Sequence, residues 1–75
     1  MSDEEKIKKI ISDHLGIAIQ DVTLDADLRK DLNAEDLEIS DLFTKLEKEF
    51  SQTVTPEDAK HLKTVNDVII FFQET

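Results

Sequence analysis

The sequence predicts an all-α fold, a bundle of four helices in a single domain that spans residues 1–75. Three observations support this prediction. Apolar residues recur at helical spacing in three separate segments. Glycine and proline occur once each, which disfavours a turn-rich β fold. Cysteine is absent, so hydrophobic packing must stabilise a domain close to the lower size limit for independent folding.

The first helix is expected to begin after Ser2, whose hydroxyl can cap it, and Glu5 follows three residues later as in a capping box. Gly16 favours the left-handed conformation that ends many helices. One buried face is indicated by residues spaced three, four and eight positions from the first, namely Ile7, Ile10, Ile11 and Leu15.

Residues 17–34 form a long connection, and loops of this length in small domains are often functional or internally packed. Apolar side chains recur along it and predict a loop that is pinned to the bundle: Ile17, Ile19, Val22, Leu24, Leu28 and Leu32. Its aspartates lack the ligand spacing and central glycine of an EF-hand. We therefore interpret them as turn residues and not as cation ligands: Asp21, Asp25, Asp27 and Asp31.

The second helix is expected to begin near Glu35 and Asp36, because acidic residues stabilise the positive end of the helix dipole. Asn33 just before it is one of the few residue types that adopt a left-handed conformation at low cost. The buried face of this helix is indicated by a strong helical repeat of apolar residues: Ile39, Leu42, Phe43, Leu46 and Phe50.

Two further helix starts are marked by caps. Thr55 followed by Pro56 begins a short third helix, since threonine caps well and proline is favoured at the first helical position. Thr64 caps the last helix, with Asp67 three residues later. The inward-facing residues of the two helices are predicted to be Ala59, Leu62, Val65, Val68, Ile69 and Phe72.

The charge balance is strongly acidic, with 18 Asp and Glu against 9 Lys and Arg and a net charge of −9. A nucleic-acid surface needs clustered Lys and Arg, so DNA and RNA are not expected as partners. Anionic membranes are disfavoured for the same reason. Basic surfaces on other proteins are the natural electrostatic complement.

The sequence shows no signal-peptide pattern at its start and no apolar run of membrane-spanning length. We therefore expect a protein of the cytoplasm or an organelle matrix that does not insert into membranes and is a monomer. His14 and His61 are isolated from other ligand types, so no metal site is expected. No cluster of nucleophile, base or phosphate loop is recognisable, and we expect neither catalytic residues nor enzyme activity.

Several motifs occur in the same order as in one known family. The segment Asp31-Leu32-Asn33-Ala34-Glu35-Asp36-Leu37 resembles the attachment loop of acyl carrier proteins, Asp-Leu-Gly-x-Asp-Ser-Leu. Residues 42–50 (LFTKLEKEF) resemble that family's Leu-x-x-x-Leu-Glu-x-Glu-Phe, and residues 15–17 and 63–67 resemble its helix boundaries. The resemblance implies the acyl-carrier four-helix bundle, with a long loop after the first helix and a short third helix. It also implies a role in fatty acid or related acyl-chain biosynthesis.

In that family a transferase attaches 4'-phosphopantetheine to the motif serine, and the thiol of the arm carries acyl groups. Asp36 stands at the serine position and has no hydroxyl. Attack of a carboxylate on a phosphoryl group would give an acyl phosphate, a mixed anhydride that hydrolyses readily. We therefore expect no phosphopantetheine on this chain at the usual site. Ser40 lies one turn further, but inside the helix, and using it would shift the register of the motif at 42–50.

The resemblance further implies a partner-binding surface on the second helix, which here comprises Glu35, Leu37, Glu38, Asp41 and Glu47. Its expected partners are basic surfaces of acyl-chain-processing enzymes or of a complex subunit. Three functions remain open from the sequence. The first is a partner-binding or regulatory homologue that carries no acyl group. The second is a genuine acyl carrier whose serine was replaced by engineering to trap the apo form. The third is a structural subunit of a larger complex.

Overall fold

The computed structural model describes residues 2–73, and in that range all regular secondary structure is helical, with no β-strand. Four α-helices and one short 3₁₀ helix follow in order: α1 (Asp3–Leu15), η1 (Ile19–Asp21), α2 (Asp36–Phe50), α3 (Pro56–His61) and α4 (Val65–Phe72). The predicted all-α acyl-carrier-type bundle is confirmed, including the long loop after α1 and the short α3. The 3₁₀ helix inside the loop was not predicted.

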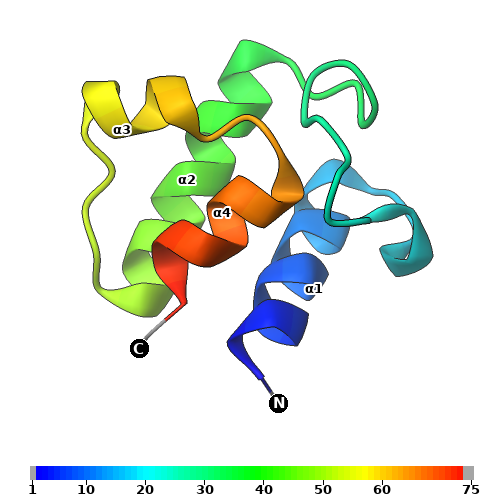
Figure 1. Ribbon diagram of the computed structural model, residues 1–75, viewed down its shortest axis with the longest axis horizontal. Helices are drawn as coiled ribbons and strands as arrows, with labels where there is room; N and C mark the ends of the chain where they lie inside the picture. The colour runs from blue at the N-terminus through cyan, green and yellow to red at the C-terminus, as the bar shows by residue number, and fades with distance from the viewer. Residues whose placement is uncertain (1, 74–75) are drawn as a thin grey trace.

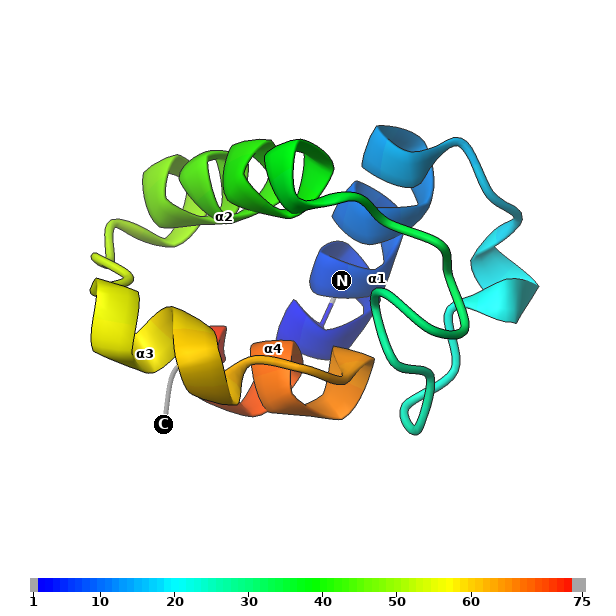
Figure 2. The same cartoon turned by 90° about the horizontal axis from the view of Figure 1, so that it is seen from above.

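The helix α1 packs against both α2 and α4. In the view of Figure 2, α2 lies on one side of the molecule, and α3 and α4 lie on the other. The start of α1 and the ends of α2 and α4 lie toward the same end of the bundle in Figure 1, while the start of α2 and the long loop lie at the opposite end. No helix in residues 2–73 has the length and apolar character needed to cross a bilayer.

One hydrophobic core lies between the helices. The predicted stripes of α2 and α4 are all buried, and Ile7 and Ile11 of α1 are fully enclosed. Ile10 and Leu15 are only partly buried and pack against the edge of this core. The core also receives Leu62 from the α3–α4 junction and Val22, Ala26, Leu28 and Ala34 from the long loop.

The predicted helix ends are confirmed by their hydrogen bonds. The Ser2 hydroxyl accepts from the Glu5 amide at 3.2 Å, and Gly16 adopts a left-handed φ of 68°. Thr55 and Thr64 each form a reciprocal capping box at the starts of α3 and α4. The left-handed residue that ends α2 was not predicted: it is Ser51, with φ of 53°.

The long loop is pinned to the bundle, as predicted, but by fewer apolar side chains than expected. Val22 and Leu28 are buried, whereas Ile19 and Leu24 are 48% and 42% exposed, so the prediction was wrong for those two. Apolar spacing along an irregular segment does not fix which side chains face inward, because the loop has no constant period. Much of the anchoring is done instead by main-chain hydrogen bonds.

These main-chain bonds join the loop to the α3–α4 junction. The Leu28 amide donates to the Lys63 carbonyl at 2.9 Å, and the Asn66 amide donates to the Leu24 carbonyl at 2.9 Å. The Val65 amide donates to the Ala26 carbonyl at 3.0 Å, so three bonds hold the two segments together. This pairing fixes the position of the loop backbone at residues 24–28, directly before Arg29.

Candidate functional site

Asp36 is the first residue of α2, as the motif predicted. The chain enters this helix through Asn33, which has the predicted left-handed conformation with φ of 58°. Glu35 is the N-cap residue in extended conformation, and its amide donates to Glu38 Oε1 at 2.9 Å. The Asp36 side chain is 88% exposed, so the site residue stands at the surface, at the positive end of the α2 dipole.

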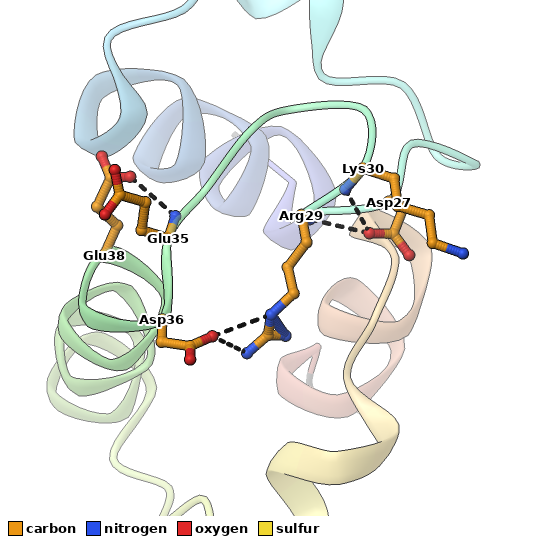
Figure 3. A network of polar contacts seen from close by, with 6 residues as sticks. All are labelled: Asp27, Arg29, Lys30, Glu35, Asp36 and Glu38. Atoms are coloured by element: carbon orange, nitrogen blue, oxygen red, sulfur yellow. Dashed lines mark hydrogen bonds and ion pairs between the residues drawn. The ribbon is translucent and has the colours of Figure 1, made fainter.

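Arg29 is the direct partner of Asp36. Its Nη2 and Nε atoms donate to Asp36 Oδ1 at 2.6 and 3.1 Å, and Figure 3 shows the guanidinium reaching from the loop to the start of α2. The Arg29 side chain is 57% exposed. Sequence reasoning missed this residue, because seven positions separate the pair and the intervening loop has no regular geometry. The only available signal was a pair of adjacent cations, Arg29 and Lys30, in a loop whose other charged residues are acidic.

The backbone that carries Arg29 is held by aspartates. Asp27 Oδ1 accepts from the amides of Lys30 and Arg29, both at 2.9 Å (Figure 3). Asp31 Oδ2 in turn accepts from the Asp27 amide at 2.7 Å. The hydrogen bond from the Lys30 amide has the largest effect on the pKa of Asp27, and together with the bond from the Arg29 amide it holds that pKa below its ordinary value. The ionised Asp27 carboxylate therefore holds the turn at residues 27–31 to a more acidic pH than an ordinary aspartate would.

Asp25 also forms a hydrogen bond within the loop. Asp25 Oδ1 accepts from the Thr23 hydroxyl at 3.0 Å, in agreement with its predicted role as a turn residue. Across residues 2–73, no three His, Asp or Glu side chains are grouped so that they could hold a metal ion. His14 Nε2 bonds to the Glu38 carbonyl at 2.9 Å and so joins the end of α1 to α2. His61 Nε2 lies 3.3 Å from a Glu57 carboxylate oxygen.

The five residues predicted to bind partners have unequal surroundings. Leu37 is 72% exposed, and Glu35 and Asp41 are also exposed. Glu38 and Glu47 are half-buried, and both carboxylates already accept from backbone amides of this chain. Glu47 Oε2 accepts from the Val54 amide at 2.7 Å and so tethers the segment between α2 and α3.

A groove of about 310 Å³ lies between α2 and α3, and Asp36 is among the residues that line it. Sequence reasoning did not identify it. Its walls combine apolar and polar side chains: Arg29, Asp36, Ile39, Ser40, Phe43, Thr44, Glu47, Val54, Thr55, Pro56, Ala59 and Leu62. Ser40 is exposed, but it lies within α2 and not at the start of the helix. Arg29 and Asp36 therefore meet on the wall of a groove whose lining is both polar and apolar.

The chain is similar to known proteins over almost its full length. The family model for the phosphopantetheine attachment site matches residues 5–72. The acyl carrier protein of Chlamydia trachomatis is 42% identical over 74 residues, which cover 99% of this chain and 96% of that protein. The acyl carrier protein of Chlamydia muridarum is 40% identical over the same length and coverage.

A solved structure supports the same assignment. The acyl carrier protein from Enterococcus faecalis superposes with a TM-score of 0.78 and 33% identity, and the match covers 96% of this chain and 95% of that one. Family model, relatives and fold agree over the helices and over the loop that leads into Asp36. The chain therefore belongs to the acyl carrier protein family.

Proposed function

We propose that this member of the acyl carrier protein family is not loaded with phosphopantetheine at residue 36 and works as a partner-binding or regulatory homologue. The observation that carries the proposal is the side chain at the first position of α2. It is an exposed carboxylate, paired with Arg29, where the family motif has a serine. The other features of the fold that position this residue are those of a carrier protein.

The chemistry of the side chain supports the proposal. Transfer of phosphopantetheine requires an oxygen nucleophile that forms a lasting phosphodiester. The Asp36 carboxylate would form a mixed anhydride that water hydrolyses, and its negative charge repels the pyrophosphate of an incoming coenzyme A. Ser40 offers a hydroxyl, but it lies one turn inside α2. The residues at the attachment position therefore do not fit the family's prosthetic group.

The surface beside Asp36 supports a role in binding proteins. Leu37 projects a largely exposed apolar side chain, and two exposed acidic residues lie near it in the chain: Glu35 at the N-cap of α2 and Asp41 within α2. An apolar contact bordered by acids suits a basic partner surface with an apolar centre. We propose acyl-chain-processing enzymes or a complex subunit as partners, with the chain acting as a monomer in the cytoplasm or an organelle matrix. Glu38 and Glu47 are weaker contact residues in this proposal, because their carboxylates serve the fold.

A loading assay tests the first part of the proposal. The protein is incubated with coenzyme A and a broad-specificity phosphopantetheinyl transferase, and its intact mass is measured. We expect an unchanged mass, while a serine-bearing acyl carrier protein in the same tube gains one phosphopantetheine group. A gain of that group by this chain would overturn the proposal, and peptide mapping would show whether Ser40 had accepted it.

A second candidate function is an ordinary acyl carrier in which aspartate replaces serine and traps the apo form. The match to acyl carrier proteins over 99% of the chain favours it, because a carrier fold is retained along the whole chain although the serine is not. The variant Asp36→Ser separates the two functions. Rapid loading of this variant would show that the transferase surface is intact and would favour the apo-trapped carrier. If the variant stays unmodified, divergence extends beyond residue 36 and the second candidate fails.

A binding assay tests the role of the α2 surface. The transferase itself is the probe, and its affinity for the unmodified protein is measured by titration calorimetry. The variants Leu37→Ala and Asp41→Lys are expected to weaken binding, since each removes an exposed contact. Asp13→Lys makes the same charge change on α1 and serves as the matched control. Equal effects of Asp13→Lys and Asp41→Lys would mean that only net charge matters.

A further inference from the structure

The basic residues of this acidic chain differ in whether a carboxylate of the chain neutralises them. Five of the nine are ion-paired with acidic side chains: Lys6, Lys8, Lys9, Arg29 and Lys60. Within residues 2–73, the other four form no ion pair, namely Lys30, Lys45, Lys48 and Lys63. Two of these four, Lys30 and Lys63, line the same pocket although they lie far apart in the sequence.

This pocket lies where the long loop meets the segment between α3 and α4. It has a volume of about 220 Å³ and is lined by Asp27, Arg29, Lys30 and Lys63. The lining residues carry three positive charges and one negative charge, a net +2 in a chain whose net charge is −9. The Leu28 amide donates to the Lys63 carbonyl at 2.9 Å, so a main-chain hydrogen bond holds the two lysine-bearing segments together.

Three acids near these lysines are engaged with the backbone instead of with the ammonium groups. Asp27 Oδ1 accepts two amides of its own turn, and Asp31 Oδ2 accepts the Asp27 amide. Asp67 Oδ2 accepts two amides at the start of α4. Figure 3 shows the Lys30 side chain pointing away from Asp36. Both lysines are exposed, so their ammonium groups are accessible to an anion from outside the chain.

We propose that this pocket binds the phosphate group of a small molecule between Lys30 and Lys63, with Arg29 at its border. The net charge of +2 on the lining complements a phosphomonoester, which carries about −1.5 to −2 at neutral pH. Each ammonium group offers three N–H donors to the phosphate oxygens. A large polyanion such as a membrane or a nucleic acid would also meet the acidic remainder of the surface, so the pocket favours a compact ligand.

The exposure of both lysines sets the size of the expected effect. Contacts between exposed charges are weak, so removal of either ammonium group is expected to weaken phosphate binding about two- to five-fold. The inference goes beyond the proposed function and does not rest on it, because Asp36 is not part of the lining. A positive or negative result in the loading assay therefore leaves this inference unchanged.

The test titrates the full chain with inorganic phosphate at constant ionic strength and follows the backbone amide chemical shifts of residues 28–30 and 63–65. Lys30→Met and Lys63→Met are each expected to weaken binding about two- to five-fold, because each keeps the apolar stem and removes the charge. Lys30→Arg and Lys63→Arg keep the charge and should retain binding. Lys48→Met makes the same change at an exposed lysine of α2 outside the pocket, and this matched control should bind phosphate like the parent protein.

Other anions define the ligand class. Sulfate, a dianion of similar shape, should bind like phosphate, and acetate should bind more weakly because it carries one charge. Glycerol 3-phosphate distinguishes the sources: tighter binding than phosphate assigns an organic phosphomonoester, and equal or weaker binding assigns free phosphate. The proposal is overturned if phosphate shifts none of these amides, if acetate binds as well as phosphate, or if Lys48→Met loses as much affinity as Lys63→Met. Binding to phosphatidylglycerol vesicles without binding of phosphate would also overturn it.

Discussion

Leu28 offers a sharp test of how the long loop is held, because its side chain is 1% exposed within the core. Truncation in Leu28→Ala removes this contact and leaves a cavity, which costs about 2–5 kcal/mol for buried leucines. Domains of this size have total stabilities of about 4–11 kcal/mol. A loss of about 3 kcal/mol corresponds to a fall in melting temperature of about 12–24 °C.

Leu24→Ala is the matched control, since the same change is made in the same loop at a side chain that is 42% exposed. Its expected cost is below about 1 kcal/mol. Both free energies of unfolding are measured by urea titration followed by far-ultraviolet circular dichroism. Equal costs for the two variants would refute the reasoning, because burial would then not determine how the loop is anchored.

Three further predictions address the helix ends and the overall charge. Ser51→Gly should stabilise the protein by up to about 1 kcal/mol, because glycine adopts the left-handed conformation at the end of α2 without strain; a lower urea midpoint would contradict this. Hydrogen bonds from the Thr64 and Lys63 amides lower the pKa of Asp67. The ionised side chain therefore contributes to the free energy of unfolding above about pH 4, and this contribution is lost as the pH falls through the lowered pKa of the folded state. The stability difference between the parent protein and Asp67→Asn should therefore shrink in acid, and a difference that is constant between neutral and strongly acidic pH would count against the capping role. The melting temperature should rise with ionic strength, because a net charge of −9 causes self-repulsion that salt screens, and a flat response would remove this argument.

The fold could be predicted from the sequence wherever one residue or a regular period determines the local structure. Gly16 and Asn33 favour left-handed conformations, and both adopt them. Thr55 and Thr64 predicted the starts of α3 and α4 through capping. The α2 stripe follows the helical period, so its buried residues could be assigned without knowing what packs against them.

The sequence was less informative where geometry depends on distant segments. Ser51 is left-handed, although serine gives no signal for this conformation. Ile19 and Leu24 are exposed, because the path of the loop is set by main-chain bonds to the α3–α4 junction. The contact of Arg29 with Asp36 depends on that same path, so the motif predicted that Asp36 lies at the start of α2 but did not predict its ion-pair partner.

The bonds between residues 24–28 and residues 63–66 have a consequence for how the protein forms during synthesis. The three main-chain hydrogen bonds that join residues 24–28 to residues 63–66 can form only after the later segment has left the ribosome. Before that stage of synthesis α1 and α2 have already emerged, but the loop beside Asp36 still lacks its hydrogen bonds to residues 63–66. A polypeptide shortened before α4 would therefore lose the environment of a residue that lies more than twenty-five positions upstream of the break.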